Sequence, residues 1–180
     1  MTGVVVPVPL APMAPMLLRP PFHRDGWVYE EKVDGWRMLA YKDGHRVRLI
    51  SRNAVDHTWR FADLAAAIAK LKRDVVVLDG EVAVFDEKLV SRVHLLGEPD
   101  PAIVTTPPTP PLFMAFDVLY ARGRDLRAES LSERRHRLEC DVQANCWTAS
   151  HAIRSSHRRS AGVWPRRARW GRRWLYSYSH

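Results

Sequence analysis

A single lysine stands where its neighbours could make it a nucleophile. Lys32 lies in segment 29–37, after two glutamates and before an Asp-Gly pair and Arg37. An ammonium has no lone pair with which to attack, so a nucleophilic lysine needs a pKa lowered by burial or by nearby cations. Arg37 and a bound metal ion would both supply such positive charge. The alternative is an ordinary lysine that ends a strand at an Asp-Gly turn.

Four more side chains have types that bind ligands, and each also has an ordinary explanation. Glu81 follows Gly80 at the start of an apolar stretch, and a carboxylate that enters a buried strand needs a polar partner. Glu30 could be a solvated strand-edge carboxylate, and Arg52 a surface arginine. Phe116 lies in an apolar run, where a core side chain is the default. Their types alone leave both interpretations open.

Strand patterns surround Lys32 and would have to position it. Residues 27–32 and 36–42 are strand-like runs. The second is joined by Asp43-Gly44, a strong hairpin signal, to the alternating segment 45–50. Lys32 is therefore expected at a strand end, beside an antiparallel meander.

Further strands and two helices complete the predicted body. Residues 75–78 and 81–85 are two strand-like runs around Asp79-Gly80, and 112–120 is an apolar run of buried-strand length. Apolar residues at helical spacing predict an amphipathic helix over about 60–72. A capping-box sequence at 130–133 opens a second helix that runs through Leu138. We expect an α+β fold, with mainly antiparallel sheets and flanking helices.

Positive charge is concentrated at one end of the chain. The formal net charge is +8, and residues 140–180 carry eight arginines with a single acid, Asp141, which gives that segment +7. This segment also lacks any sustained apolar period, so we expect a disordered basic tail. Its arginines and tryptophans leave nucleic-acid binding open as the alternative. The basic character of the whole chain therefore says little about the surface of the folded part.

Four segments, in order, resemble motifs of one enzyme family. The motif Lys-x-Asp-Gly-x-Arg at 32–37 is similar to the signature of the ATP-dependent DNA ligases. These belong to the nucleotidyltransferase superfamily, which includes RNA ligases and mRNA capping enzymes. Segments 51–53, 78–81 and 113–120 look like later motifs of the family. The resemblance covers residues 22 to 139 and implies part of a nucleotidyltransferase (ATP-grasp-like) adenylation domain.

The resemblance implies a role for each candidate residue. Lys32 would attack the α-phosphate of ATP and hold AMP as a phosphoramidate. Glu81 would contact the ribose hydroxyl and help to bind the metal ion. Phe116 would stack on adenine, where an aromatic ring gives a large contact area at low entropy cost.

Three more residues would contact the nucleotide or the nucleic acid. By the resemblance, Glu30 would contact the adenine, and Arg37 the sugar or a nucleic-acid phosphate. Arg52 would bind phosphate in a similar way, which suits a planar bidentate donor. The implied cofactors are ATP and Mg2+ or another divalent metal, because the ion offsets charge on the triphosphate. The implied partner is nicked DNA, whose 5′-phosphate and 3′-hydroxyl the enzyme would seal in repair, replication or recombination.

The chain also departs from the family pattern. We find no Glu-Gly-Val-Val type strand and no Lys-x-Lys strand, and no lysine follows Lys88. In the family the first strand supplies a metal-site carboxylate and the second supplies lysines that bind the α-phosphate, so their loss should slow phosphoryl transfer. We therefore expect a truncated domain with little or no ligase activity alone, in which residues 140–180 arise from a frame change. The alternatives are an inactive remnant that at most binds ATP or DNA, and an RNA ligase or capping-type nucleotidyltransferase.

The expected organisation has three parts. Residues 1–22 form a proline-rich N-terminal segment, 23–139 the N-terminal part of the adenylation domain, and 140–180 the basic tail. No apolar run reaches the length of a membrane span, and the start of the chain lacks the pattern of a secretory signal. We expect a cytoplasmic monomer.

Overall fold

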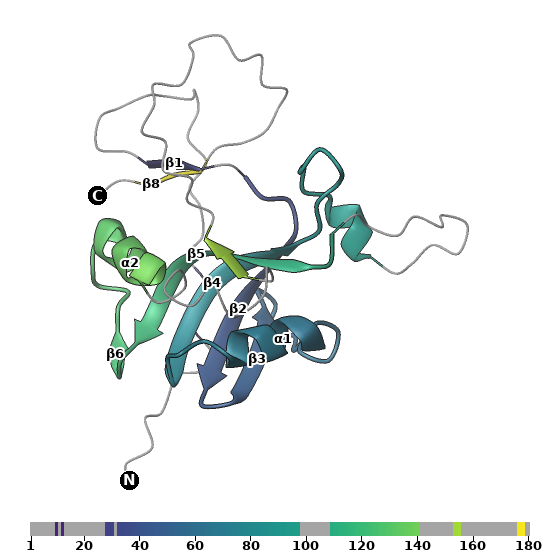
Figure 1. The fold of residues 1–180 in the computed structure, drawn as a ribbon. Coiled ribbons are helices and arrows are strands. Elements are labelled where there is room, and N and C mark those ends of the chain that lie inside the picture. Colours follow the sequence, from purple (N-terminus) through teal and green to yellow (C-terminus); the bar gives the residue numbers. More distant parts are fainter. Residues whose placement is uncertain are drawn as a thin grey trace.

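One antiparallel sheet is the centre of the fold in this computed structural model (Figure 1). The structure describes Leu10, Pro12 and residues 28–30, 32–97, 109–140, 153–155 and 176–178. The strands are β1 (Val28–Glu30), β2 (Trp36–Asp43), β3 (Arg46–Ser51), β4 (Val75–Ala83), β5 (Leu112–Ala121), β6 (Arg124–Asp125), β7 (Ile153–Ser155) and β8 (Tyr176–Tyr178). The helices are α1 (Ala62–Ala69), the 3-10 helix η1 (Val93–Leu96) and α2 (Leu131–Leu138).

The strand order in the main sheet is β3-β2-β4-β5-β6, with β7 also paired to β5. The pairs from β3 to β6 are antiparallel, and β7 runs parallel to β5. The β2–β3 hairpin closes at Gly44, whose φ of 58° suits a residue without a Cβ atom. The predicted meander next to Lys32 is therefore confirmed, and so is the mainly antiparallel α+β class.

The predicted interruption at Asp79-Gly80 is wrong, because β4 runs unbroken through both residues. Gly80 is buried, and a Cβ atom there would lie 2.7 Å from the Met114 carbonyl oxygen and 2.7 Å from a ring carbon of Phe113. The glycine thus serves the close approach of β5 rather than a turn. An Asp-Gly pair in sequence does not distinguish these two uses.

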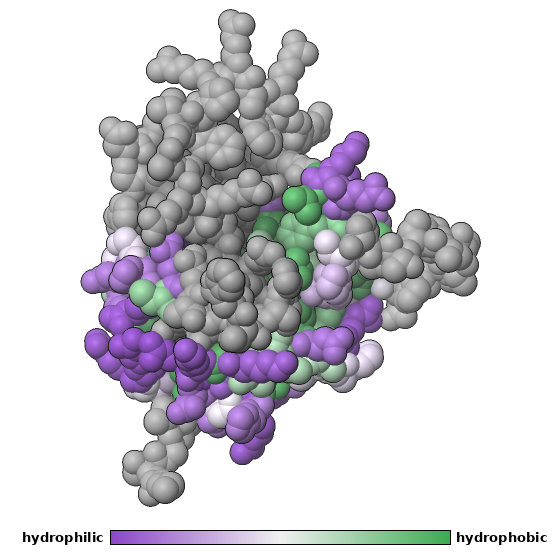
Figure 2. All heavy atoms as spheres, in the orientation of Figure 1, coloured by the Kyte–Doolittle hydropathy of each residue, from purple (hydrophilic) through white to green (hydrophobic). Residues whose placement is uncertain are grey.

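The two faces of the sheet have different coverings. The larger core lies on the face of Met38 and Leu78, where α1 adds Leu64 and Ile68. The α1 helix is shorter than the predicted 60–72, and no side chain caps its start at Phe61. In Figure 2, apolar side chains gather above α1 and hydrophilic ones lie around them.

The opposite face carries a smaller apolar cluster that includes Leu39, Tyr41 and Val77. Leu10 joins this cluster, and its N–H donates to the Tyr41 hydroxyl at 2.9 Å. The rest of the predicted segment 1–22, apart from Pro12, lies outside the described residues.

The α2 helix packs against β5 at the edge of the sheet (Figure 1). Its predicted capping box is confirmed: the Ser130 hydroxyl accepts from the Glu133 N–H, and the Glu133 carboxylate accepts from the Ser130 N–H. The helix ends at Leu138, as predicted, and this residue is buried in the larger core.

Two short strands lie within 140–180, where the sequence predicted no element. β7 pairs with Phe113–Ala115 of β5, and β8 pairs with β1. Unpaired backbone groups at a sheet edge accept an extended segment without requiring an apolar pattern, which explains the miss. The remaining residues predicted as a disordered tail, from 141 onward, lie outside the description. Among the described residues, no helix is long and apolar enough to cross a membrane.

Candidate functional site

Polar side chains gather on the sheet face that α1 leaves uncovered. Arg37 of β2 lies directly opposite Glu81 of β4 in the antiparallel register. Asp79 lies two residues before Glu81 on the same strand, so the alternation of a strand places both carboxylates on the face of Arg37. Two adjacent strands therefore bring a guanidinium and two carboxylates together.

Arg37 and Asp79 form a bidentate ion pair. Arg37 Nε lies 3.1 Å from Asp79 Oδ1, and a terminal guanidinium nitrogen lies 2.7 Å from Oδ2. The Asp79 side chain is 2% exposed. Burial raises the pKa of Asp79 above its usual range, and the hydrogen bonds from Arg37 act against that rise. The pair fixes the guanidinium on the site face.

Glu81 is a half-buried carboxyl group near two cations. Burial raises the pKa of Glu81 to about 7, while the charges of Arg37 and Lys32 and a hydrogen bond from the Gly35 N–H oppose the rise. The polar partners that the sequence required for a carboxylate in this strand are therefore present.

Lys32 lies just beyond β1, which ends at Glu30 rather than at the predicted residue 32. Its Nζ lies 3.3 Å from Asp34 Oδ1, with side chains 29% and 50% exposed. The Asp34 N–H donates to the Ser91 hydroxyl at 2.8 Å, which ties the Lys32 segment to the loop before η1. The lysine is thus half-buried and held next to a turn whose backbone is fixed.

Gly35 lets the Lys32 segment lie close to β4. A Cβ atom at Gly35 would lie 2.2 Å from the Val82 carbonyl oxygen and 2.9 Å from Glu81 Cγ. Real Cβ atoms do not approach so closely. A glycine is therefore needed for Lys32 and Glu81 to share one site.

A β-bulge sets the place of Phe116. In the β4–β5 register Asp79 pairs with Asp117 and Gly80 with Ala115, so Phe116 is the unpaired extra residue. The Arg37 guanidinium carbon lies 5.3 Å from the centre of the Phe116 ring. The half-buried Phe116 ring thus makes a cation–π contact with Arg37.

The structure brings together four of the six predicted site residues. Arg37 lies opposite Glu81 and contacts the Phe116 ring, and the charge of Lys32 acts on Glu81. Arg52 lies apart, exposed in the turn that follows β3. The backbone of Glu30 belongs to β1, but its side chain lies outside the description.

Sequence reasoning assigned no role to Asp79 or to Ser91. Asp79 could have been found from strand alternation, since it lies two residues before Glu81 and faces the partner strand that carries Arg37. Ser91 has no sequence signal, because its contact with Asp34 spans 57 residues and depends on the loop before η1.

The described residues hold no group of three or more His, Cys, Asp or Glu side chains arranged to bind a metal ion. Proteins usually bind a Mg2+ ion through one or two carboxylates together with substrate phosphates. Of the predicted site residues whose side chains are described, Glu81 is the carboxylate that could hold such an ion.

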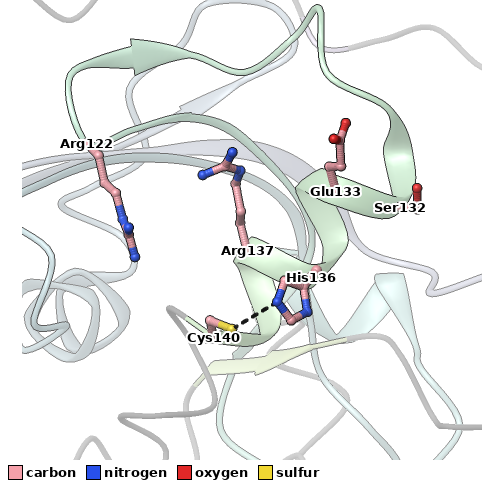
Figure 3. A pocket seen from close by; sticks show the side chains of 6 residues that line it. All are labelled: Arg122, Ser132, Glu133, His136, Arg137 and Cys140. Atoms are coloured by element: carbon pink, nitrogen blue, oxygen red, sulfur yellow. Dashed lines mark hydrogen bonds between the residues drawn. The ribbon is translucent and has the colours of Figure 1, made fainter.

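A separate hollow of about 520 Å3 lies at α2 and the turn between β5 and β6 (Figure 3). It is lined by Arg122, Ser132, Glu133, His136, Arg137 and Cys140. None of the six predicted site residues lines it. We therefore assign it no part in the chemistry at Lys32.

Comparison with known proteins gives consistent similarities. The family model for the ATP dependent DNA ligase domain matches residues 17–166. The multifunctional non-homologous end joining protein LigD of Pseudomonas aeruginosa is 39% identical over 147 residues, which are 77% of this chain and 16% of that protein. DNA ligase C1 of Mycolicibacterium smegmatis is 34% identical over 166 residues, 84% of this chain and 47% of that protein.

Solved structures give a similar result for the fold. The ligase domain of LigD from M. tuberculosis superposes with a TM-score of 0.55 at 34% identity, covering 66% of this chain and 38% of that one. A mycobacterial DNA ligase D complexed with ATP and MES gives a TM-score of 0.54 at 34% identity, covering 66% and 37%. The chain thus spans less than half the length of each of these relatives. The family match also extends past both predicted boundaries, at 22 and at 139, which stay predictions.

Proposed function

The chain belongs to the ATP-dependent DNA ligase family, and we propose from this premise that Lys32 is the residue that accepts AMP from ATP. The observation that carries the proposal is that Arg37 lies opposite Glu81 and against the ring of Phe116, while Gly35, in the same turn as Lys32, lies close to Glu81. These residues come from separate segments of the chain. They offer a nucleophile, a carboxylate and an aromatic ring within one site.

The transfer step forms one bond and breaks another. Lys32 Nζ, after losing a proton, attacks the α-phosphorus; the new phosphorus–nitrogen bond holds AMP, and pyrophosphate leaves with the electrons of the α–β bond. An acceptor for the proton within reach is Asp34 Oδ1, at 3.3 Å. The turn that holds Asp34 therefore also controls where the nucleophile points.

The nucleotide would lie across the uncovered face. Phe116 would stack on the adenine, Glu81 would contact the ribose hydroxyl, and Glu30 would contact the adenine edge. Glu81 with the triphosphate oxygens would hold Mg2+, which when bound offsets charge on the triphosphate. Fixed positive charge near the phosphates comes from Arg37, whose orientation Asp79 maintains.

The second substrate of the proposal is nicked DNA. AMP would pass from Lys32 to the 5′-phosphate at the nick, and the 3′-hydroxyl would then displace AMP and seal the strand. Arg52 is exposed beyond β3 and would bind a nick phosphate. The named relatives join DNA, which favours DNA over RNA ends or caps as the acceptor. The proposal takes the protein as a cytoplasmic monomer.

Labelling with radioactive ATP tests the proposal. The full chain is incubated with Mg2+ and ATP labelled either at the α- or at the γ-phosphate, and protein-bound label is measured after denaturation. We expect label from the α-position only, because pyrophosphate leaves.

Two variants make the result specific. Lys32→Ala should remove all label, whereas Lys88→Ala, an exposed lysine in the loop after β4, should keep it. Label that survives in Lys32→Ala would refute the assignment. Absence of label from the unmodified chain under excess enzyme, with ATP still bound, would favour the inactive alternative.

A further inference from the structure

A second buried ion pair lies one strand away from Arg37 and Asp79. Arg134 of α2 binds both carboxylate oxygens of Asp117 on β5, at 2.8 Å from Nε and 3.0 Å from a terminal nitrogen. The two side chains are 5% and 7% exposed. Arg134 also donates to the Glu129 carbonyl oxygen at 2.6 Å, so its guanidinium is held from two sides.

The two ion pairs meet across the β4–β5 register. Asp79 and Asp117 are direct partners in that register, and like charges in directly opposed positions repel each other. Each carboxylate has its own bidentate guanidinium, Arg37 for one and Arg134 for the other. The arrangement is stable only while both guanidinium groups are present.

The same register carries the bulge that presents Phe116. Asp117 directly follows Phe116, and the ring of Phe116 lies against the guanidinium of Arg37. The pairing of Asp117 with Arg134 therefore holds the residue that follows the bulge. It also keeps the Asp117 carboxylate from competing with Asp79 for Arg37.

We propose that Arg134 is a positioning residue for the nucleotide site, acting through Asp117. By satisfying Asp117, it leaves Arg37 bound to Asp79 beneath Phe116. Without Arg134, a buried and unpaired Asp117 carboxylate draws Arg37 toward β5 and away from Glu81. The inference rests on the proposed nucleotide site only for the effect on ATP binding, because the positioning of Arg37 by Arg134 is a property of the unliganded chain.

The first test follows Arg37 without any nucleotide. NMR spectra are recorded on the full chain with isotope-labelled arginine. The Nε–H resonances of Arg37 and Arg134 are assigned from variants that lack each arginine, and each resonance is sensitive to the carboxylate that its guanidinium binds. Arg134→Met should shift the Arg37 resonance. The double variant Arg134→Met with Asp117→Asn should restore it, because the competing charge is gone. The control is Arg137→Met, which also removes an arginine of α2 but breaks an ion pair with Glu129 instead; it should leave the Arg37 resonance unchanged.

The second test measures ATP. Arg134→Met should weaken ATP binding and slow labelling of Lys32 by about tenfold per folded molecule, a normal size for coupling between sites. The folded fraction is taken from circular dichroism in the same samples. The double variant should recover most of the affinity, whereas a purely structural role of Arg134 predicts that the double variant binds no better than Arg134→Met.

The outcomes separate this inference from the proposed function. An Arg37 resonance that does not respond to Arg134→Met overturns the positioning role. A resonance that shifts and is restored, in a chain that neither binds ATP nor labels Lys32, supports the positioning role and refutes the proposed function.

Discussion

Arg37 connects most groups of the candidate site. It pairs with Asp79, lies opposite Glu81 and contacts the ring of Phe116. The family motif gave Arg37 a role toward ligand, but its four fixed positions do not include the residues that hold it in place. The structure adds those residues, and they come from neighbouring strands rather than from the motif.

Removal of the Phe116 ring should weaken nucleotide binding. We expect Phe116→Ala to reduce ATP affinity about tenfold or more, because a stacked base is typically worth about 1–3 kcal/mol. Trp59→Ala is the matched control, since Trp59 is also aromatic and is 77% exposed on the loop before α1. Titration calorimetry with ATP compares the two. Equal affinities would show that adenine does not stack on Phe116.

Asp56 should make the loop after β3 sensitive to acid. Its carboxylate accepts hydrogen bonds from the Thr58 hydroxyl and from Arg48 Nε, and these contacts lower the pKa of Asp56 below 3.8, the ordinary value for an aspartate. A folded pKa below the unfolded one adds stability above the unfolded pKa, and this stability is lost as the pH falls through the folded value. Asp56→Asn should therefore lower the melting temperature at pH near 7.

The pH dependence is the diagnostic part of this prediction. The difference in melting temperature between the chain and Asp56→Asn should shrink as the pH falls below 3.8. Glu87→Gln, at an exposed loop position after β4, should show no such difference. A difference that stays constant with pH would mean that the Asp56 charge contributes nothing.

At the scale of elements, local sequence patterns correctly predicted the structures that depend on interactions between residues near in sequence. The β2–β3 hairpin, the α2 capping box and the buried β5 strand are all set by residues near in sequence, and all three are confirmed. The unbroken β4 was missed because Gly80 serves a neighbouring strand, which no pattern within β4 reports. The bulge at Phe116 likewise depends on the register between two strands.

Gly80→Ala tests the close packing of β4 and β5. The new methyl group would meet the Met114 carbonyl and the Phe113 ring, so we expect a loss of about 1–3 kcal/mol in the free energy of unfolding. Gly97→Ala is the control, because its nearest contact, the His94 carbonyl oxygen at 3.3 Å, is milder. Urea unfolding of both variants gives the values. Equal stability in the two would mean that β5 yields to the added methyl.

At the scale of the whole molecule, charge and site are separate. Residues 140–180 account for +7 of the net +8, whereas Arg52 and the site lie in the part with nearly balanced charge. Binding to intact DNA through many arginines falls steeply with salt and ignores sequence. Under the proposed function, a preference for a nick over intact duplex would therefore come from the body.

Nick preference should depend on Arg52. Arg52→Gln should abolish the preference for nicked over intact duplex and reduce the salt slope by about one. Arg46→Gln, exposed at the other end of β3, should reduce the slope in a similar way and keep the preference. Anisotropy titrations over a salt series measure both quantities. A nick preference that survives in Arg52→Gln would remove Arg52 from the DNA site.

The most direct test of the account is to locate the adenylyl group. The chain is incubated with ATP and Mg2+, digested, and sequenced by tandem mass spectrometry, and the sample is then treated with pyrophosphate. We predict one adenylyl group, on Lys32 alone among the five lysines, and its removal by pyrophosphate. An adenylyl group on another residue, or one on Lys32 that pyrophosphate cannot remove, would contradict it.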